Sequence, residues 1–340
     1  MVILTEEGYG LKIRTKDVAR IANVSTATVS RVINGSPNVS EKTRQRVLMA
    51  IESLNYKPDV FAKNLAKKRF YEIGIGCPDE VFKGIESSEY QFYVKVFEGI
   101  QDYFSRKKCN YSIFPFSMMN ERDGIEAKDG FLLVGGGISE EIIEKFQKIG
   151  KPFVLVDQFI SGYDVDCVIS NGFDGEYKLI KAFLEKGYRR IAYIHNTAKH
   201  FSYEQRMIGY RRAMNEKGLL PIVYDFEEGQ DLKLLLKRIL NDNKDAELIA
   251  VFEDRYAIET IEYLRELGKK VPEDLGVLGF DNIMSSISCQ PPLTTVHVPK
   301  EEMGSLAAKR LFDLLNKEDI SPVQISLFTK VLIRESTQFR

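Results

Sequence analysis

The 340-residue chain is nearly neutral, with 48 Lys and Arg against 49 Asp and Glu. Its four cysteines stand singly along the sequence, so their spacing indicates neither a zinc site nor a disulfide framework. That usage fits a reducing, cytoplasmic environment. No apolar run is long enough to cross a membrane. The sequence therefore predicts a cytoplasmic protein, and nothing in it calls for a metal or a cofactor.

Charge is distributed unevenly along the chain. Residues 1–70 contain 13 Lys and Arg and 6 Asp and Glu, whereas the remaining 270 contain 35 and 43. A basic segment suits contact with DNA phosphates, because each neutralised phosphate releases a bound counterion. On charge alone, a solvated helical bundle with incidental Lys and Arg is an equally good interpretation.

Two short helices separated by a tight turn are predicted in this basic segment, over Asp17–Ala22 and Thr26–Ile33. Asn23 suits the corner because asparagine tolerates a positive φ, and Ser25 is a natural N-cap for the second helix. The apolar residues at helical spacing are predicted to face inward: Val18, Ile21, Val24, Val29, Val32 and Ile33. The outward set suits a helix that lies in the major groove of DNA. This set consists of Thr26, Ala27, Ser30 and Arg31.

A third helix is predicted over Glu41–Leu54, with Ser40 as its cap, and Pro58 ends the three-helix segment. The next segment, 59–68, is too short to be a stable helix in isolation. We expect it to fold when it pairs with its own copy on DNA, where Leu65 would enter a minor-groove step. An ordinary linker is the alternative.

The motifs of this first part are long and specific. They are Asp17-Val18-Ala19, Val24-Ser25-x-x-Thr28-Val29-Ser30-Arg31-Val32-Ile33-Asn34-Gly35, Val39-Ser40-x-x-Thr43-Arg44, and Leu54-Asn55-Tyr56-x-Pro58 followed by Ala62-x-x-Leu65. Together they resemble the DNA-binding head of the lactose-repressor (LacI/GalR-type) family. The resemblance implies that Thr26, Ala27 and Arg31 read base edges and that Leu65 is a minor-groove lever. It also implies positions that hold phosphates or frame the groove: Ser25, Ser30, Asn34, Asn38, Ser40, Thr43 and Tyr56. Lys16, Ala62 and Lys63 complete the predicted DNA-binding set.

The rest of the chain alternates between strand-like and helical stretches, which predicts parallel sheets with helices on both faces. The expected strands are 72–76, 111–116, 130–134, 152–157, 167–170, 190–195, 248–252 and 276–280. The expected helices are 92–106, 140–149, 174–186, 204–217, 231–241, 255–267 and 300–315. Ligands of such sheets bind at the carboxyl ends of the strands.

Motifs such as Pro152–Asp157, Gly187–Ile194 and Val271–Asp281 resemble the effector domain of the same family, an α/β two-lobed periplasmic-binding-protein-like fold. The resemblance predicts an all-α helix-turn-helix head at 11–57, a hinge helix at 58–70 and an effector-binding and dimerisation domain at 71–340. Residues 1–10 form a leader of unknown role. Lobe one is expected over about 71–169 and 300–319, and lobe two over about 170–298 and 320–340. Segment 112–128 is too short for the usual strand and full helix, so we expect a trimmed helix in lobe one.

The resemblance places a small-molecule pocket between the two lobes. Arg206, Asp157 and Asp281 match ligand-facing positions, and Glu253-Asp254 stands where the family typically has Asn-Asp. The residues expected to bind the effector are Asp79, Phe92, Asp157, Arg206, Glu253, Asp254 and Asp281, with Tyr93, Phe201 and Tyr203 as further candidates for stacking. Carboxylates, arginine and aromatic rings are the residue types that hold sugar hydroxyls and the apolar face of a sugar ring. A sugar is therefore the expected effector.

Three alternatives compete with a sugar-responsive repressor. An enzyme is disfavoured because the chain has no G-x-G-x-x-G, Gly-Lys-Ser/Thr or G-x-S-x-G motif, so we expect no catalytic residue and interpret Gly135–Gly137 as a turn. An exported sugar-binding protein would have no use for the basic head. A repressor that requires a nucleobase or another metabolite as corepressor stays open on the same scaffold.

Oligomeric state and mechanism follow from the geometry of DNA. One recognition helix reads only a half-site, so we expect a homodimer on a pseudo-palindromic double-stranded operator. Ligand in the cleft would then move one lobe against the other and unpair the hinge helices, which lowers the affinity for the operator. The family resemblance favours repression, with carbohydrate-utilisation genes as the expected targets.

Overall fold

The computed structural model describes residues 15–33, 39–54, 70–85, 91–120, 125–198, 200–227, 229–318 and 321–338. The chain divides into two compact units, Met1–Arg69 and Phe70–Arg340. Several predictions fall outside the described residues: the leader 1–10, Asn34, Asn38, Tyr56, Ala62, Lys63, Leu65, and the hinge 58–70 apart from Phe70. These stay predictions from the sequence.

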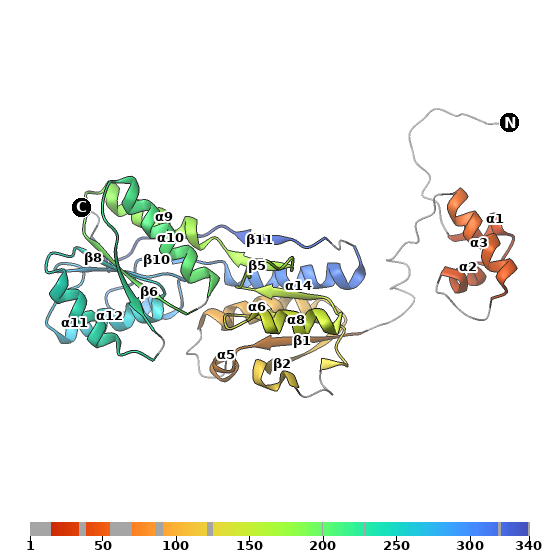
Figure 1. The fold of residues 1–340 in the computed structure, drawn as a ribbon, viewed down its shortest axis with the longest axis horizontal. Coiled ribbons are helices and arrows are strands. Elements are labelled where there is room, and N and C mark those ends of the chain that lie inside the picture. The colour runs from red at the N-terminus through yellow and green to blue at the C-terminus, as the bar shows by residue number, and fades with distance from the viewer. Residues whose placement is uncertain are drawn as a thin grey trace, which may run out of the picture. The chain divides into compact units, whose positions relative to one another are not determined.

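The first unit contains three helices, α1 (Thr15–Ala22), α2 (Thr26–Ile33) and α3 (Glu41–Ser53) (Figure 1). Asn23 has a φ of +51° at the corner between α1 and α2, as predicted. The Ser25 hydroxyl accepts a hydrogen bond from the Thr28 N–H at 3.1 Å, and the Ser40 hydroxyl accepts one from the Thr43 N–H at 3.4 Å. Both predicted N-caps are thus confirmed, and they fix where α2 and α3 begin.

The core of this unit is small and aliphatic. It consists of Val18, Ala19, Ala22, Val29, Val32, Val47 and Ala50, with Val24, Ile33, Val39, Ile51 and Leu54 packed around it. The predicted inward position of Ile21 is wrong, because 53% of this side chain is exposed. Ile21 lies about 100° around α1 from its neighbour Ala22, so it falls off the narrow stripe that α1 buries.

The second unit is built on two parallel sheets, one in each lobe. Lobe one has six strands in the order β11-β5-β4-β3-β1-β2, namely β11 (Gln324–Leu327), β5 (Cys167–Ser170), β4 (Phe153–Val156), β3 (Gly130–Val134), β1 (Tyr71–Cys77) and β2 (Cys109–Pro115). Lobe two has four in the order β7-β6-β8-β9, namely β7 (Ile222–Phe226), β6 (Ile191–Asn196), β8 (Leu248–Val251) and β9 (Gly276–Leu278). An antiparallel pair, β10 (Thr295–His297) and β12 (Lys330–Leu332), accompanies the second sheet.

Helices cover both faces of each sheet (Figure 1). Lobe one carries α5 (Asp79–Gly84), α6 (Gln91–Ser105), the 3₁₀ helix η1 (Phe116–Asn120), α8 (Glu140–Ile149) and α14 (Lys300–Asn316). Lobe two carries α9 (Gly172–Glu185), α10 (Phe201–Glu216), α11 (Leu232–Asp242), α12 (Asp254–Glu266) and α13 (Ser285–Ser288). The helix α14 packs directly on α6, because Gly99 and Gly304 have no Cβ to collide with the facing backbone. The connection from β2 to β3 includes η1, and the trimmed helix expected there stays a prediction.

The predicted elements of this unit are all present, with ends shifted by three residues at most. Four strands were not predicted, and they are β7, β10, β11 and β12. The predicted lobe boundary needs one correction: β11 pairs in parallel with β5, so 324–327 extends the sheet of lobe one although 320–340 was assigned to lobe two. The chain therefore passes between the lobes near 171, 299 and 329, and these crossings hold the two lobes side by side.

Candidate functional site

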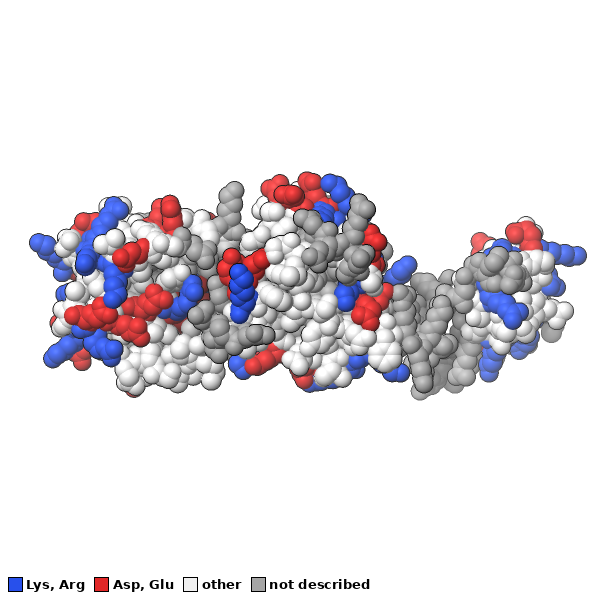
Figure 2. Space-filling view, turned by 90° about the horizontal axis from the view of Figure 1, so that it is seen from below, with Lys and Arg blue, Asp and Glu red and all other residues white. Residues whose placement is uncertain are grey.

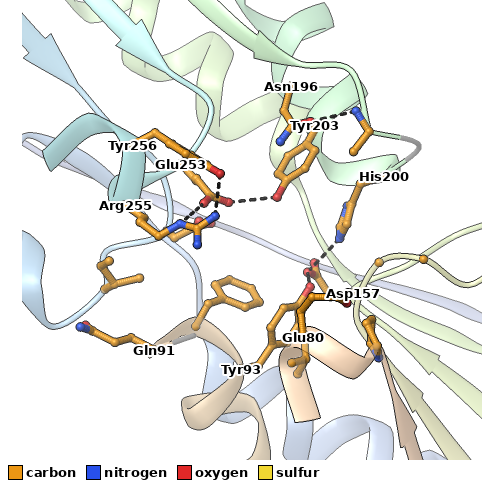
Figure 3. A pocket seen from close by; sticks show the side chains of 18 of the residues that line it. Glu80, Gln91, Tyr93, Asp157, Asn196, His200, Tyr203, Glu253, Arg255 and Tyr256 are labelled. Atoms are coloured by element: carbon orange, nitrogen blue, oxygen red, sulfur yellow. Dashed lines mark hydrogen bonds and ion pairs between the residues drawn. The ribbon is translucent and has the colours of Figure 1, made fainter. Parts of the chain in front are cut away.

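A cavity of about 330 Å³ lies between the two lobes, where strands of both sheets end (Figure 3). Lobe one contributes Pro78, Glu80, Val81, Gln91, Phe92, Tyr93, Gly136, Gly137 and Asp157. Lobe two contributes Asn196, Ala198, His200, Tyr203, Arg206, Glu253, Arg255, Tyr256, Asp281 and Ile283. The carboxyl ends of parallel strands are where ligands bind in α/β proteins, so the cavity has the position of a ligand site.

Asp157 stands at the junction of the two lobes. It follows β4 with a φ of +60° and is almost completely buried. One carboxylate oxygen accepts a hydrogen bond from the Tyr93 hydroxyl at 3.2 Å, and the other accepts one from the Ser202 hydroxyl at 3.2 Å. Since Tyr93 belongs to lobe one and Ser202 to lobe two, this carboxylate bonds to both lobes.

His200 caps the start of α10 and faces Asp157 (Figure 3). Its Nδ1 accepts a hydrogen bond from the Ser202 N–H at 3.2 Å, which leaves the proton of the neutral ring on Nε2, 3.6 Å from an Asp157 oxygen. Burial lowers the pKa of His200, although Asp157 opposes that effect. The ring lies against Gly136, where a Cβ would stand only 2.5 Å from His200 Cδ2. The sequence motif Gly135–Gly137 is indeed a turn, and its middle glycine leaves room for this imidazole.

Arg206 and Asp281 form a buried ion pair in the wall of the cavity, with Nη2 and Oδ1 2.8 Å apart. The Nη1 atom donates to the Phe252 carbonyl oxygen at 2.5 Å, and the guanidinium lies 3.9 Å from the centre of the Phe280 ring. Burial acts to lower the pKa of Arg206, but Asp281, with smaller contributions from Tyr203 and Asp157, more than offsets this, so the pKa is raised and the cation stays charged. The pair therefore presents fixed donors and acceptors to the cavity.

The wall next to this pair holds a second network. The Tyr203 hydroxyl donates to the Glu253 carboxylate at 2.9 Å, and Arg255 Nε lies 3.3 Å from the same carboxylate (Figure 3). Arg255 Nη2 also donates to the Tyr256 hydroxyl at 2.8 Å. Two arginines and four carboxylates thus line one cavity together with aromatic rings, which is a surface for a polar ring compound.

Two predicted effector-binding residues do not line the cavity. Asp254 is fully buried and accepts hydrogen bonds from the Thr295 hydroxyl at 2.6 Å and the Ile283 N–H at 2.9 Å. The Asp254 side chain points into the protein from the start of α12. Its hydrogen bond to Ile283 holds the loop that carries Asp281. Asp79 accepts hydrogen bonds from the Ser117 hydroxyl and N–H, and so it ties α5 to η1.

Of the four aromatic residues predicted to contact the effector, three line the cavity and one does not. Phe92, Tyr93 and Tyr203 line the cavity, with the rings of Phe92 and Tyr93 edge to face at 5.1 Å. Phe201 instead packs on Phe159, with ring centres 5.1 Å apart. Among the polar and aromatic side chains of the lining, those that sequence reasoning missed are Glu80, Gln91, Asn196, His200, Arg255 and Tyr256. Asn196 ends a strand and Arg255 follows one closely, so a search of strand ends alone would have found these two.

The first unit displays its predicted DNA-binding residues on the surface. Of those that the structure describes, Lys16, Ser25, Thr26, Ala27, Ser30, Arg31 and Ser40 are exposed and Thr43 is half-buried. Thr26, Ala27, Ser30 and Arg31 share the outward side of α2, whose other side is buried through Val29 and Val32. Figure 2 shows Lys and Arg side chains on the surface of this unit. A basic surface with an exposed, short-chained helix suits a groove of DNA.

Within the described parts of the chain, no cluster of three or more His, Cys, Asp or Glu side chains could bind a metal ion. The same parts contain no helix with the length and apolar character needed to span a membrane.

Comparison with known proteins agrees with this architecture. Residues 15–59 match the bacterial regulatory proteins of the lacI family, and residues 180–337 match the periplasmic binding protein-like domain. Catabolite control protein A of Priestia megaterium is 30% identical over 339 residues, which cover 95% of this chain and 98% of that protein. The HTH-type transcriptional repressor PurR of Mannheimia succiniciproducens is 29% identical, with the same two coverages. Among solved structures, the complex of the transcriptional regulator CelR with cellobiose has a TM-score of 0.70 and 26% identity, covering 95% of this chain and 99% of that chain.

A helix-turn-helix unit followed by a two-lobed binding domain defines a class of DNA-binding transcriptional regulators. The chain belongs to the lacI family of bacterial regulatory proteins. It is a DNA-binding transcriptional repressor of that family, whose members are regulators rather than enzymes.

Proposed function

We propose that this repressor binds a small sugar in the cavity between the lobes and leaves its operator when the sugar is bound. One observation carries the proposal: aromatic rings and paired charges line the same cavity. Phe92, Tyr93 and Tyr203 offer flat apolar faces, and the Arg206–Asp281 pair offers a donor and an acceptor side by side. A sugar needs both, because its ring has an apolar C–H face and a rim of hydroxyls.

A disaccharide is the effector that we favour. The similar CelR structure holds cellobiose, and the resemblance spans 95% of this chain. Rim side chains such as Glu80 and Arg255 extend the polar lining beyond the Arg206–Asp281 pair, which gives a second sugar ring partners of its own. Asp157, Arg206, Glu253 and Asp281 are the proposed contacts to hydroxyls.

On the DNA side, Thr26, Ala27 and Arg31 are the proposed base-reading residues. Lys16, Ser25, Ser30, Ser40 and Thr43 are the proposed phosphate contacts, together with those predicted in the undescribed segments. We further propose that the protein acts as a homodimer, because one α2 helix can cover only half of a two-fold symmetric operator.

The proposed coupling uses the residues that join the lobes. Sugar that contacts Asp157 from lobe one and Arg206 from lobe two favours one relative position of the lobes over the other. Lobe one begins directly after the hinge segment, so a change in lobe position alters the spacing of the two hinges in a dimer. Couplings of this kind typically amount to about 1–3 kcal/mol, or roughly 5–150-fold in affinity.

The test is a thermal-shift screen of the full chain against cellobiose, lactose, glucose and galactose, with adenine and guanine as the competing class. A sugar that binds should stabilise the protein by about 2.7 kcal/mol at a hundredfold excess over its Kd. The same sugar should then lower affinity for a selected operator duplex roughly 5–150-fold. Stabilisation by a nucleobase alone, with tighter operator binding, would replace the proposal by a corepressor mechanism.

A further inference from the structure

A buried carboxyl group lies near Arg206 but is not among the residues that line the cavity. It belongs to Glu176 in the middle of α9, whose side chain is 1% exposed. Neither of its oxygens has a hydrogen-bond partner within the described part of the chain. A carboxyl group is rarely buried without a partner, because losing its contact with water costs free energy. The position of this side chain therefore calls for an explanation.

The residues around Glu176 have unsatisfied polar atoms of their own. Among the described residues, Arg206 Nε and the Tyr193 hydroxyl are also buried without a hydrogen-bond partner. Tyr193 comes from β6, and Arg206 comes from α10. Three elements thus carry an acceptor, a cationic donor and a hydroxyl whose charges interact within lobe two.

The packing of α9 on α10 places Glu176 next to Arg206. Gly172, one turn before Glu176, has its Cβ position 3.4 Å from Arg206 Cγ. Gly209, one turn after Arg206, has its Cβ position 3.2 Å from Glu176 Cβ. The two glycines thus let α9 and α10 approach closely. The side chains of Glu176 and Arg206 lie in the contact between these two helices.

Electrostatics agree with this placement. Burial raises the pKa of Glu176 to about 8, and the Arg206 guanidinium opposes that rise. Burial raises the pKa of Tyr193 and of Tyr210, and Glu176 adds to both rises; the two rings stack with their centres 4.8 Å apart. The groups that face Glu176 are therefore Arg206 and Tyr210 from α10 and Tyr193 from β6.

We propose that Glu176 is a positioning residue of the effector pocket, whose carboxyl group holds Nε of Arg206 through a water shared with Tyr193. The guanidinium already has Nη1 on Phe252 and Nη2 on Asp281, so an anchor at Nε fixes its third edge. A planar group held at three edges cannot rotate, and its orientation toward a bound hydroxyl is then set in advance. The inference rests on the proposed function, because it takes Arg206 to be the effector contact.

The first test needs no effector. NMR spectra of full-length protein labelled with ¹⁵N at arginine contain an Nε–H signal for Arg206. This signal is assigned because it disappears in Arg206→Lys. Glu176→Met removes the acceptor but keeps an unbranched side chain of similar length, and Glu176→Gln restores a carbonyl acceptor. We expect solvent exchange of this N–H to accelerate by roughly tenfold or more in Glu176→Met and to stay near the native rate in Glu176→Gln. Glu185→Gln, an exposed acid on the same helix, is the matched control.

The second test measures cellobiose binding by calorimetry in the same variants. Glu176→Met should weaken binding roughly tenfold, with Glu176→Gln close to the native protein. An unchanged exchange rate in Glu176→Met overturns the inference, whatever the sugar result. If no sugar binds even to the native protein while the exchange rates change as expected, the sugar proposal fails and the Glu176–Arg206 contact stands.

Discussion

Nε2 of His200 lies 3.6 Å from a carboxylate oxygen of Asp157, across the boundary between the two lobes. The neighbouring Gln158 adds a second bridge, because its side-chain oxygen accepts a hydrogen bond from the Phe201 N–H at 3.2 Å. Elsewhere along the lobe boundary, the Gln91 side chain accepts a hydrogen bond from the Ser285 N–H at 3.0 Å. Polar contacts thus join the lobes at separate points, and any change in lobe position has to break some of them.

The contact between Gly136 and His200 gives a first prediction. Gly136→Ala places a methyl group against the buried imidazole, and overpacking of this kind costs about 1–3 kcal/mol. We expect the melting temperature to fall by roughly 2–4 °C for each kcal/mol. His200→Ala should remove the ring that this methyl group meets. The double variant, Gly136→Ala with His200→Ala, should therefore lose less stability than the sum of the two single changes. Strict additivity in scanning calorimetry would show that the two residues do not touch.

The buried ion pair gives a second prediction. Arg206→Ala leaves the Asp281 carboxylate buried without its cation, which typically costs about 3–5 kcal/mol. Adding Asp281→Asn removes the unpaired charge, so urea unfolding should show that the double variant recovers part of the loss. In DNA-binding assays below the melting temperature, Arg206→Ala should keep operator affinity and lose the response to sugar. A normal sugar response would remove Arg206 from the effector site.

Two buried acids predict how stability depends on pH. Burial raises the pKa of Glu176 to about 8 and that of Asp254 to about 7. In the unfolded chain both groups lose their protons near pH 4, so the folded state binds more protons between about pH 4 and 8. Their contribution to stability is therefore complete at the acid end of this window and is lost as the pH rises through it.

Urea unfolding at pH 5, 6.5 and 8 measures this dependence. We expect Glu176→Gln, which has no proton to lose, to raise the unfolding midpoint more at pH 8 than at pH 5. Equal gains at both pH values would mean that Glu176 titrates normally in the folded protein.

The exposed side of α2 gives a fourth prediction. Arg31→Ala should weaken binding to the selected operator by about 1–3 kcal/mol and relax sequence preference at one position in each half-site. Lys16→Ala should weaken binding to all duplexes alike. It should also reduce, by about one, the slope of the logarithm of the binding constant against the logarithm of the salt concentration. If both variants lose affinity uniformly, Arg31 contacts phosphates and does not read a base.

The sequence predicted most of the fold because its signals are local. Alternating apolar stretches separated by turns marked the central strands, and Ser25 and Ser40 marked helix starts through their side-chain chemistry. The missed strands β10, β11 and β12 are three or four residues long, and apart from two residues of β10 their residues are half-buried or exposed. Such segments become strands through pairing with distant ones, as β11 does with β5.

The site was predicted less completely, because a residue at a strand end can face either way. Asp281 faces the cavity, whereas Asp254 turns into the protein to hold the loop that carries Asp281. His200 has no motif of its own: its place depends on Gly136 and Asp157, which are far away in sequence. Glu176 lies on the apolar face of a helix, where only the packing of α9 on α10 brings it to Arg206.

The most direct measurement combines DNA and sugar in one titration. Full-length protein is used to select duplexes from a random pool, and fluorescence anisotropy then follows binding to the best duplex at several salt concentrations, with and without cellobiose. We predict a two-fold symmetric site, an affinity that falls steeply with salt, and a further roughly 5–150-fold loss on adding the sugar. Binding that is insensitive to salt, or that no mono- or disaccharide weakens, would contradict the account of a sugar-released repressor.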